Sequence, residues 1–452
     1  MMKFNKTFFI SLLAALTLSA VGCGEKDIPT TGTDPDNNGT TTVTPGNEMV
    51  IYEANPKVFA SSGAIKAMED RLDEIQDLGV NVLWIMPVHP IGSVNSVGSP
   101  YCVKDFKAVN SSYGTLSDLK SLVNKAHSMG MKVILDWIAN HTAWDNSWIT
   151  EHPDWYTKDA NGNIISPAGM GWNDVADLNF NSTAMRTEMI EAMKFWVAEA
   201  GIDGFRCDYA EGVPSDFWTD AIKAIRSVKK DAVMLAEAAD SKLYDCGFDM
   251  LYGWDFQSRL ADVFAGKRKV ENLYDSHRNE YKGIADGKER MRFSTNHDKA
   301  MNESSPISMY KGERGAMAAF VIAAYMGGVP MIYSSQEIGY AKTLSFFTST
   351  VMDWNSNPSY TEEYQKVMKA YTETAPERGG NVTLYNTGNI VSIYYQGGLM
   401  VAVNTTGEPV QVKTPMERSG DKAVNMMTGK QESIPSALSL AAYEYKIWKI
   451  EK

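Results

Sequence analysis

The chain has 452 residues, of which 44% are hydrophobic and 11% aromatic, and this length and composition predict a globular protein with a large core and more than one domain. Its formal net charge is −12 at pH 7, and no basic block is present, which argues against nucleic acid or an anionic membrane surface as a partner. Besides Cys23 the chain contains Cys102, Cys207 and Cys246. An odd number of cysteines gives no disulfide framework, and no Cys or His spacing predicts a zinc site.

Residues 1–22 are typical of a signal peptide, because two lysines precede an apolar run that is too short to span a bilayer. The sequence Ala-Val-Gly-Cys at 20–23 is similar to a bacterial lipobox, so Cys23 is expected to carry lipid and to become the mature N-terminus. An ordinary secreted protein is the alternative. Residues 23–48, rich in Thr, Gly, Pro and Asp, predict a flexible tether. We therefore expect export and a lipid anchor in a bacterial membrane, most simply the outer membrane, on its periplasmic or surface face.

From residue 49 to 375 one pattern repeats, in which a helical segment, a Gly or polar break and a short apolar strand follow one another. Eight strands are predicted, at 50–53, 82–86, 133–136, 205–208, 233–237, 248–251, 292–295 and 329–333. Alternating helices and apolar strands indicate a parallel sheet covered by helices, and eight such units predict a (β/α)8 barrel. A doubly wound sheet is the alternative, but no Gly-x-Gly-x-x-Gly sequence follows an early strand.

Two regions depart from this pattern. Residues 141–185 are too long for an ordinary strand-to-helix loop, and we predict a small excursion over the barrel mouth that contains Trp144, Trp148, Trp155 and Trp172. Residues 376–452 contain β-rich segments with turn residues between them, which predicts an all-β C-terminal domain, a small sandwich.

Acidic and histidine residues follow the predicted strands, where the active site of such a barrel lies. They are Asp136 and His141 at the third strand, Asp208 at the fourth, Glu237 at the fifth, and His297 with Asp298 at the seventh. Any one of these acids alone is most simply a loop cap, and Arg206 with Asp208 alone is most simply a structural ion pair. Together at one rim, they predict a functional site.

Asp208 and Glu237 end adjacent predicted strands, which lie about 4.8 Å apart. Their carboxyl groups can therefore approach the ~5–5.5 Å separation of a retaining glycosidase. Arg206, two residues before Asp208, is expected to keep that carboxylate ionised. The apolar surroundings of Glu237 are expected to raise its pKa, so that it holds a proton.

From about residue 49 to the end, the chain resembles the α-amylase family, glycoside hydrolase family 13. Five segments carry the resemblance to family motifs: 136–141 (DWIANH), 177–179 (DLN), 204–208 (GFRCD), 236–237 (AE) and 295–298 (TNHD). The segment 236–237 is nearly uninformative alone, whereas all five in this order at barrel strand ends form a specific signal.

The resemblance implies roles for individual residues. Asp208 matches the nucleophile, Glu237 the general acid/base, and Asp298 the acid that holds two sugar hydroxyls. Four further residues match substrate-binding positions: His141, His297, Arg206 and Tyr101, of which Tyr101 is similar to a tyrosine that stacks under the sugar ring. Asp136 is similar to a supporting acid behind these groups.

The resemblance also implies a structural calcium ion. Asn140 and Asp177 match two of its ligands, and Gly212 stands where many members contribute a main-chain carbonyl. The chain departs from the family at 209–211, where Tyr-Ala-Glu replaces a Lys-His pair that contacts sugar in several α-amylases, and at Ser334-Ser335, where many members have a glycine.

These observations predict an α-amylase-type retaining hydrolase that cleaves α-1,4 bonds of an α-glucan such as starch, glycogen or maltooligosaccharides. A transglycosylase or an exo-acting α-glucosidase or maltogenic enzyme is the nearest alternative. A non-catalytic glycan-binding scaffold is a third, and it would have lost one of the acids, none of which is missing. The sequence does not fix endo or exo action, chain-length preference or oligomeric state.

Overall fold

The structure is a computed structural model that describes residues 48–378, 381–386 and 388–451. The predicted signal peptide, Cys23 and nearly all of the predicted tether lie outside the described residues. Within the described ranges, no helix combines the length and apolar character needed to cross a membrane.

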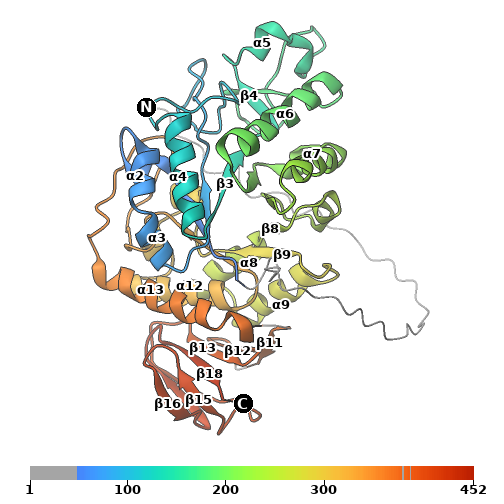
Figure 1. The fold of residues 1–452 in the computed structure, drawn as a ribbon. Helices are drawn as coiled ribbons and strands as arrows, with labels where there is room; N and C mark the ends of the chain where they lie inside the picture. The colour runs from blue at the N-terminus through green and yellow to red at the C-terminus, as the bar shows by residue number, and fades with distance from the viewer. Residues whose placement is uncertain (1–47, 379–380, 387, 452) are drawn as a thin grey trace, which may run out of the picture. The chain divides into compact units, whose positions relative to one another are not determined.

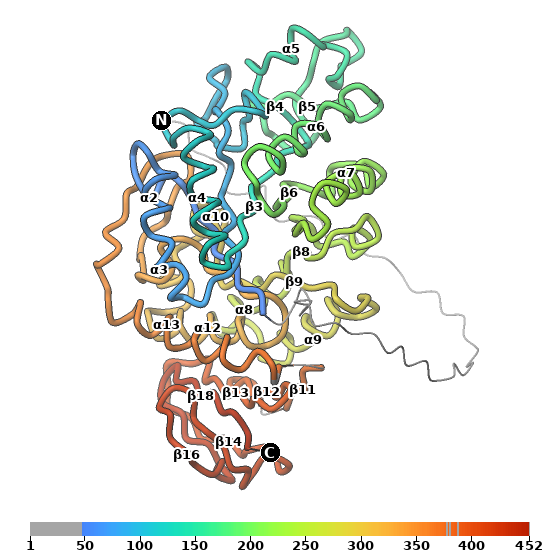
Figure 2. Tube along the Cα trace, in the orientation of Figure 1, coloured from blue at the N-terminus to red at the C-terminus, as the bar shows by residue number. Residues whose placement is uncertain are grey.

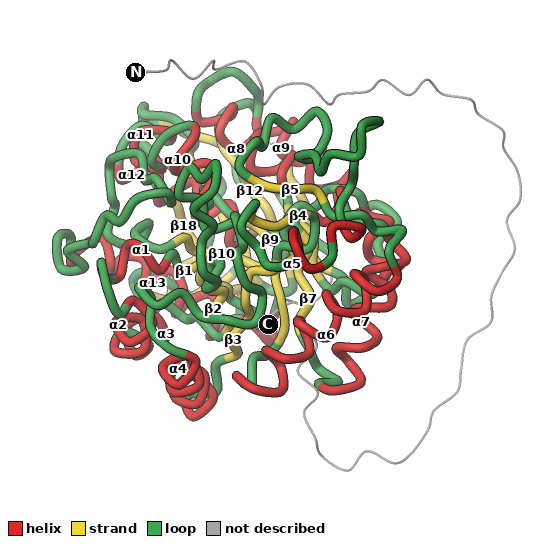
Figure 3. Tube along the Cα trace, turned by 90° about the horizontal axis from the view of Figure 1, so that it is seen from above, coloured by secondary structure: helices red, strands yellow, loops and turns green. Residues whose placement is uncertain are grey.

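Eight parallel strands close into a barrel in the order β1-β10-β9-β8-β7-β6-β3-β2. Figure 3 shows these strands at the centre of the molecule, with helices around them. The strands are β1 (Ile51–Ala54), β2 (Val82–Ile85), β3 (Lys132–Trp137), β6 (Gly204–Cys207), β7 (Val233–Ala236), β8 (Met250–Tyr252), β9 (Glu289–Arg292) and β10 (Val329–Tyr333). The predicted (β/α)8 barrel is thus confirmed, and the doubly wound sheet is excluded, because β1 pairs with both β2 and β10.

The helices that follow these strands form the outer layer (Figure 1). They include α1 (Pro56–Phe59), α2 (Ala64–Asp70), α3 (Leu72–Asp77), α4 (Leu116–Ser128), α6 (Thr183–Ala200), α7 (Ser215–Val228), α8 (Trp254–Phe264), α9 (Val270–Tyr281), α10 (His297–Asn302), α11 (Pro306–Met309), α12 (Glu313–Tyr325) and α13 (Pro358–Glu373). Helix α4 begins with the capping box that its sequence indicates, since the Thr115 hydroxyl accepts from the Asp118 N–H and Asp118 accepts from the Thr115 N–H.

The seventh barrel strand was predicted three residues too late. The structure places it at 289–292 instead of 292–295, paired with β8 through Met250–Glu289 and with β10 through Pro330–Arg292. The charged residues of this strand interrupt the apolar pattern by which the other strands were predicted. Arg292 is nevertheless buried, because its guanidinium pairs with Glu280. The sixth strand is likewise displaced, to 250–252 from 248–251.

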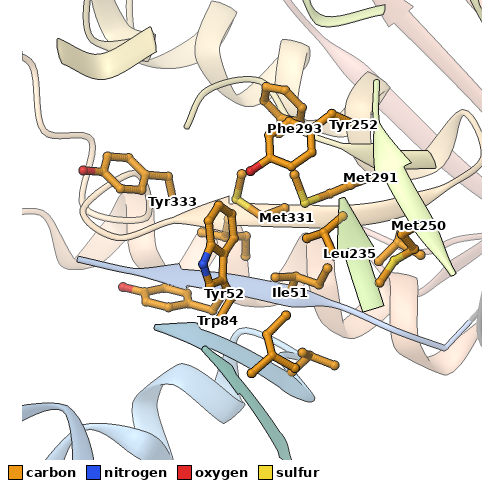
Figure 4. Close-up of a cluster of buried hydrophobic side chains, with 14 of the residues drawn as sticks. Ile51, Tyr52, Trp84, Leu235, Met250, Tyr252, Met291, Phe293, Met331 and Tyr333 are labelled. Atoms are coloured by element: carbon orange, nitrogen blue, oxygen red, sulfur yellow. The ribbon is translucent and has the colours of Figure 1, made fainter. Parts of the chain in front are cut away.

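Large side chains from most of the barrel strands pack together (Figure 4). Those that Figure 4 labels include Ile51, Trp84, Leu235, Met250, Met291 and Met331, and all six are buried. The barrel is therefore a packed core and not a pore, and hydrophobic burial holds the strands in one register. The polar side chains of the predicted site lie at or near the ends of the strands.

The predicted excursion is built on a short antiparallel pair, β4 (His141–Ala143) and β5 (Val175–Asp177), between β3 and α6. Figure 2 shows β4, β5 and the short helix α5 (Trp148–Glu151) at one end of the barrel, next to α6. Because β4 starts four residues after β3, the excursion begins at the end of a barrel strand, where the predicted site lies.

The C-terminal region is all-β, as predicted. A six-stranded sheet has the order β11-β12-β13-β18-β15-β16, and β14 pairs with β17. The strands are β11 (Thr383–Tyr385), β12 (Val391–Gln396), β13 (Leu399–Asn404), β14 (Val410–Lys413), β15 (Lys422–Asn425), β16 (Lys430–Ser433), β17 (Ala437–Leu440) and β18 (Tyr445–Ile450). Side chains from both sheets, among them Val391, Trp448 and Leu438, form one apolar cluster, which is the core of a small sandwich.

The three cysteines in the described part of the chain, Cys102, Cys207 and Cys246, are free and buried. This agrees with the expectation of no disulfide framework. Burial also raises the pKa of Cys102, to about 12, which keeps that thiol protonated.

Candidate active site

The predicted acids lie at one end of the barrel. Asp136 is in β3 and pairs in register with Arg206 of β6, while Asp208 and Glu237 directly follow β6 and β7. His297 and Asp298 begin α10, five and six residues beyond the last residue of β9. Because all barrel strands are parallel, their C-terminal ends share one rim, and these residues meet there.

The guanidinium group of Arg206 lies at the centre of three carboxylates. Its Nη1 donates to Oδ1 of Asp136 and to Oδ1 of Asp208, each at 2.8 Å. Its Nη2 lies 3.0 Å from Oε2 of Glu237, in a charge contact that is not aligned as a hydrogen bond. Its Nε donates to the Tyr252 hydroxyl at 3.0 Å. Arg206 is fully buried, so these contacts take the place of the hydrogen bonds that water would make to the guanidinium group.

Burial raises the pKa of each of these carboxyl groups. Desolvation raises the pKa of Asp208 to about 6, with Arg206 opposing and Asp136 adding to the rise. Desolvation raises the pKa of Glu237 to about 7, again opposed by Arg206. Both carboxyl groups therefore hold a proton to a higher pH than an ordinary acid, and Glu237 does so more than Asp208. The expected rise for Glu237 is present, whereas for Asp208 burial outweighs the lowering by Arg206.

A second group of residues lies on the other side of Asp136. The Tyr101 hydroxyl donates to Oδ2 of Asp136 at 3.1 Å and lies 2.9 Å from Nε2 of His297. The Tyr101 and His297 rings are stacked, 5.4 Å apart. The same Nε2 is 3.5 Å from Oδ2 of Asp298, whose side chain is 35% exposed, more than those of Asp208 and Glu237. Asp298 is thus the acid that faces solvent most.

His141 and the predicted calcium ligands Asn140 and Asp177 come together through β4 and β5. His141 pairs in register with Asp177, and the Leu178 N–H donates to the Asn140 carbonyl at 3.1 Å. The Nε2 of His141 lies 3.2 Å from the Tyr101 carbonyl oxygen, and burial lowers the pKa of His141 to about 4, so this imidazole is neutral.

The third predicted ligand, Gly212, lies against the ring of Tyr209, which a Cβ at 212 would meet at 2.0 Å. Among the residues that the structure describes, no group of three His, Cys, Asp or Glu side chains is arranged to hold a metal. The oxygen donors of Asn140 and Asp177 nevertheless suit a hard cation, and burial raises the pKa of Asp177, a cost that a bound cation would offset.

The four tryptophans of the excursion have different surroundings. Trp148 and Trp155 pack edge to face at 5.0 Å, so they belong to the core of the excursion. Trp172, in contrast, lies 5.6 Å from the His141 ring and 5.2 Å from the Tyr209 ring, next to the acids. The Nε1 of Trp144 donates to the Asn173 carbonyl oxygen. Trp172 is therefore the tryptophan of this set that lies against predicted site residues.

Three buried side chains complete the site and were missed in the sequence. Tyr252 accepts from Arg206, Trp84 donates to Oδ2 of Asp136 at 3.2 Å, and Glu53 contacts Nδ1 of His297. Glu53 lies near the end of β1 and carries the signal that identified the other acids, an acidic residue at the end of an apolar strand. Tyr252 and Trp84 carry no signal, because an aromatic residue in a strand is usually core.

Glu211, in the segment that departs from the family, has a local partner. Its Oε1 accepts from the N–H groups of Ala239 and Asp240, in the loop directly after Glu237. The Glu211 carboxylate thus stabilises the loop that follows Glu237.

The family model described as the alpha amylase catalytic domain matches residues 29–164 and 169–380. The chain belongs to the α-amylase family. Membership places it among glycoside hydrolases and the transglycosylases related to them.

Among curated relatives, it is 26% identical over 344 residues to Alpha-amylase 3 of Dictyoglomus thermophilum, with 64% of each chain covered. It is 23% identical over 396 residues to a cyclomaltodextrinase of Thermoanaerobacter pseudethanolicus, with 81% of this chain and 67% of that chain covered.

Among solved structures, a maltogenic alpha-amylase from Thermotoga neapolitana is similar, with a TM-score of 0.79 and 26% identity over 89% of this chain and 98% of that one. An alpha-amylase from Lactobacillus plantarum has the same TM-score and coverage at 28% identity. The chain spans 64%, 50% and 44% of the lengths of three curated amylases that it matches.

Replacing Arg206 with Met should destabilise the fold by about 3–5 kcal/mol, because it leaves three buried carboxylates without their cation. The loss should be larger at pH 8 than at pH 5. These carboxyl groups have pKa values raised by folding, and without Arg206 the values rise further, so their unfavourable contribution grows as pH rises and vanishes once they are protonated. Thermal unfolding at both pH values measures this. An equal loss at pH 5 and pH 8 would show that Arg206 acts through packing alone.

Proposed function

We propose that the protein is a retaining hydrolase of α-1,4-glucosidic bonds in starch, glycogen or maltooligosaccharides. The observation that carries the proposal is the placement of Asp208 and Glu237 on the two η nitrogens of one Arg206 guanidinium, at the ends of adjacent strands. Two carboxylates held by one guanidinium group lie near each other, which favours the ~5–5.5 Å separation of retaining glycosidases over the wider gap that an inverting enzyme needs for its water.

In the proposed reaction, Asp208 attacks the anomeric carbon while Glu237 donates its proton to the glycosidic oxygen. The bond between sugar and leaving group breaks, and a glycosyl ester forms on Asp208. Glu237, now ionised, takes a proton from water, whose oxygen attacks the anomeric carbon and releases Asp208. The raised pKa of Glu237 suits the first step, because the carboxyl group keeps its proton to a higher pH than an ordinary glutamic acid.

The remaining residues would bind the sugar. Asp298, the most exposed of the acids, would hold two hydroxyls of the distorted ring, and His141 and His297 would donate to or accept from others. Tyr101 would stack under the ring, and Asp136, buried behind it, would hold Tyr101 and Arg206 in place. These roles follow the family resemblance, and the proximity of the side chains supports them.

A transglycosylase or an exo-acting enzyme of the same family is the second candidate. It is favoured by relatives whose names describe transfer or maltose production, including a maltosyltransferase of Rhodospirillum rubrum, 32% identical over 213 residues. The two candidates share the first chemical step, and they differ in whether water or a sugar hydroxyl attacks the ester.

The proposal is tested by measuring activity on starch, pullulan and maltoheptaose. The wild-type protein is compared with Asp208→Asn and Glu237→Gln. Each variant should lose at least about a thousandfold in kcat. Asp70→Asn is the control, because it makes the same kind of amide replacement at an exposed position of helix α2. It should leave kcat unchanged. NMR of the first product should show the α anomer, and chain-length analysis separates hydrolysis from transfer. A β anomer, or a variant that retains more than about a thousandth of wild-type kcat, would refute the assignment of the two acids.

The pH dependence of kcat/KM should be bell-shaped. Asp208 must be ionised, so activity should fall as pH decreases below about 6, and Glu237 must be protonated, so activity should fall as pH increases above about 7. The apparent values belong to the coupled pair. Initial rates at low substrate concentration from pH 4.5 to 9 measure the profile. A rate that stayed constant from pH 7 to 9 would contradict the role of Glu237.

A structural calcium ion held by Asn140, Asp177 and the Gly212 carbonyl is part of the proposal. Its support is the pairing of β4 with β5, which brings Asn140 and Asp177 together, and the raised pKa of the Asp177 carboxyl. Such an ion would fasten the excursion to the barrel. Chelation with EGTA should then lower the thermal midpoint, and Asp177→Asn should remove that sensitivity. An unchanged midpoint, with no calcium in elemental analysis, would exclude the ion.

Export and a lipid anchor at Cys23 remain part of the proposal as well. They rest on the sequence of residues 1–23, which lie outside the described part of the chain. Mass spectrometry of the mature N-terminus from membranes tests them, and an unmodified peptide that begins elsewhere would exclude the anchor.

A further inference from the structure

Glu53 is a buried carboxylate at the end of β1 that the proposed reaction does not use. Its side chain has no exposed surface. Its Oε1 contacts Nδ1 of His297, which follows β9, whereas no hydrogen bond reaches its Oε2 from any residue that the structure describes. Burial raises the pKa of Glu53, so the ionised form is costly unless a cation is paired with it.

The directions of the neighbouring hydrogen bonds determine the protonation of that partner. The Tyr101 hydroxyl has one proton, and Tyr101 donates it to Asp136. The contact of 2.9 Å between the Tyr101 oxygen and Nε2 of His297 therefore needs a proton on Nε2. An ionised Glu53 can only accept, so its contact with Nδ1 needs a proton on Nδ1 as well. Both ring nitrogens then carry protons.

From this geometry we propose that Glu53 is a positioning residue, which keeps His297 doubly protonated and thereby fixes Tyr101 against Asp136. The result is a chain of hydrogen bonds in which each contact has one defined donor and one defined acceptor. His297 donates to Glu53 and to Tyr101, Tyr101 donates to Asp136, and Asp136 accepts from Arg206. The alternative is a neutral pair, in which Glu53 carries the proton and His297 is uncharged.

The surroundings of His297 favour the charged form. Burial of the His297 ring among aromatic side chains lowers the pKa of His297 by desolvation. The charges of Asp298 and Glu53 outweigh this effect and raise the pKa to about 9. The groups that face it are Glu53 from β1, Tyr101 from the loop after β2, Asp136 from β3, Arg206 from β6 and Asp298 beside it. Three of these are acids and one is a cation, so a positive imidazolium is stabilised.

A charged His297 makes two cations at a mouth that holds five acids. These acids are Glu53, Asp136, Asp208, Glu237 and Asp298. The second cation adds positive charge beside Asp298 and holds Tyr101 against Asp136, next to the two acids of the proposed reaction. The consequence for turnover therefore rests on the proposed function, whereas the protonation of His297 does not, so the two can fail separately.

The test measures His297 directly, by NMR of 15N-labelled histidine, with the signal assigned by its loss in His297→Asn. In the full-length protein, both ring nitrogens should carry protons at pH 8. In Glu53→Gln, which preserves shape but removes the charge, the pKa of His297 should fall by about 1–3 units, so that the ring is mostly neutral at pH 8. In Glu53→Asp, which keeps the charge, the ring should stay protonated.

Glu337→Gln is the matched control. Glu337 is also buried, also accepts from a side chain, the Tyr52 hydroxyl at 2.7 Å, and also has an Oε2 without a partner within the described ranges, but it does not contact His297. This variant should lose comparable thermal stability while the His297 signal stays unchanged. Glu53→Gln should also lose roughly tenfold in kcat at pH 8 and recover at pH 6, where its His297 regains the proton.

A neutral His297 at pH 8 in the wild-type protein would overturn the proposal, whether or not the Glu53 variants fold. So would a His297 pKa that Glu53→Gln leaves unchanged, or an equal loss of kcat at pH 6 and pH 8, which would indicate a purely structural acid. If His297 titrates as expected but neither starch nor maltooligosaccharides are cleaved, the assignment of Glu53 stands and the proposed function fails.

Discussion

The guanidinium group of Arg206 is the interaction on which the site depends. Three carboxylates from three neighbouring strands, Asp136, Asp208 and Glu237, converge on it within 3.0 Å, and all four groups are largely buried. Without a cation, three acids at one barrel rim would repel each other and protonate. With it, the carboxylates of Asp136 and Asp208 accept hydrogen bonds from one nitrogen of the guanidinium group, and the carboxylate of Glu237 lies against the other. One planar cation thus holds three acids together at one rim.

That arrangement in turn depends on the closed barrel. Neighbouring parallel strands place Asp136, Arg206 and Leu235 in one register, so the residues that follow β6 and β7 emerge side by side. The packed apolar interior below fixes the strands (Figure 4). Because Tyr101, Trp84 and Tyr252 donate to or accept from these buried charges, a contact between Glu53 and His297 can affect Asp136 and Arg206. The site is one hydrogen-bonded network and not a set of separate residues.

Much of this could be predicted because the physical signals are local. An apolar run followed by an acid identifies a strand end, and Asp208 and Glu237 were found by that rule. The rule failed for the seventh strand, where buried Arg290 and Arg292 make the sequence look polar. Their partners lie far away in the chain, such as the carbonyl oxygens of Ala239 and Gly327, and no local pattern shows them. The tryptophans could not be sorted either, since Trp148 and Trp172 differ only in what they meet after folding.

The sequence by itself determined the barrel, the excursion, the β-sandwich and the identity of the acids, because periodicity and strand-end chemistry are properties of short segments. The tertiary structure alone decided which charges share a proton and which side chains hold others in place. Glu53 and His297 are 244 residues apart in the chain, and Tyr101 joins them to Asp136 only when two strands, a loop and a helix meet. Protonation depends on burial and on the nearest charges in space, and those distances exist only in the folded barrel.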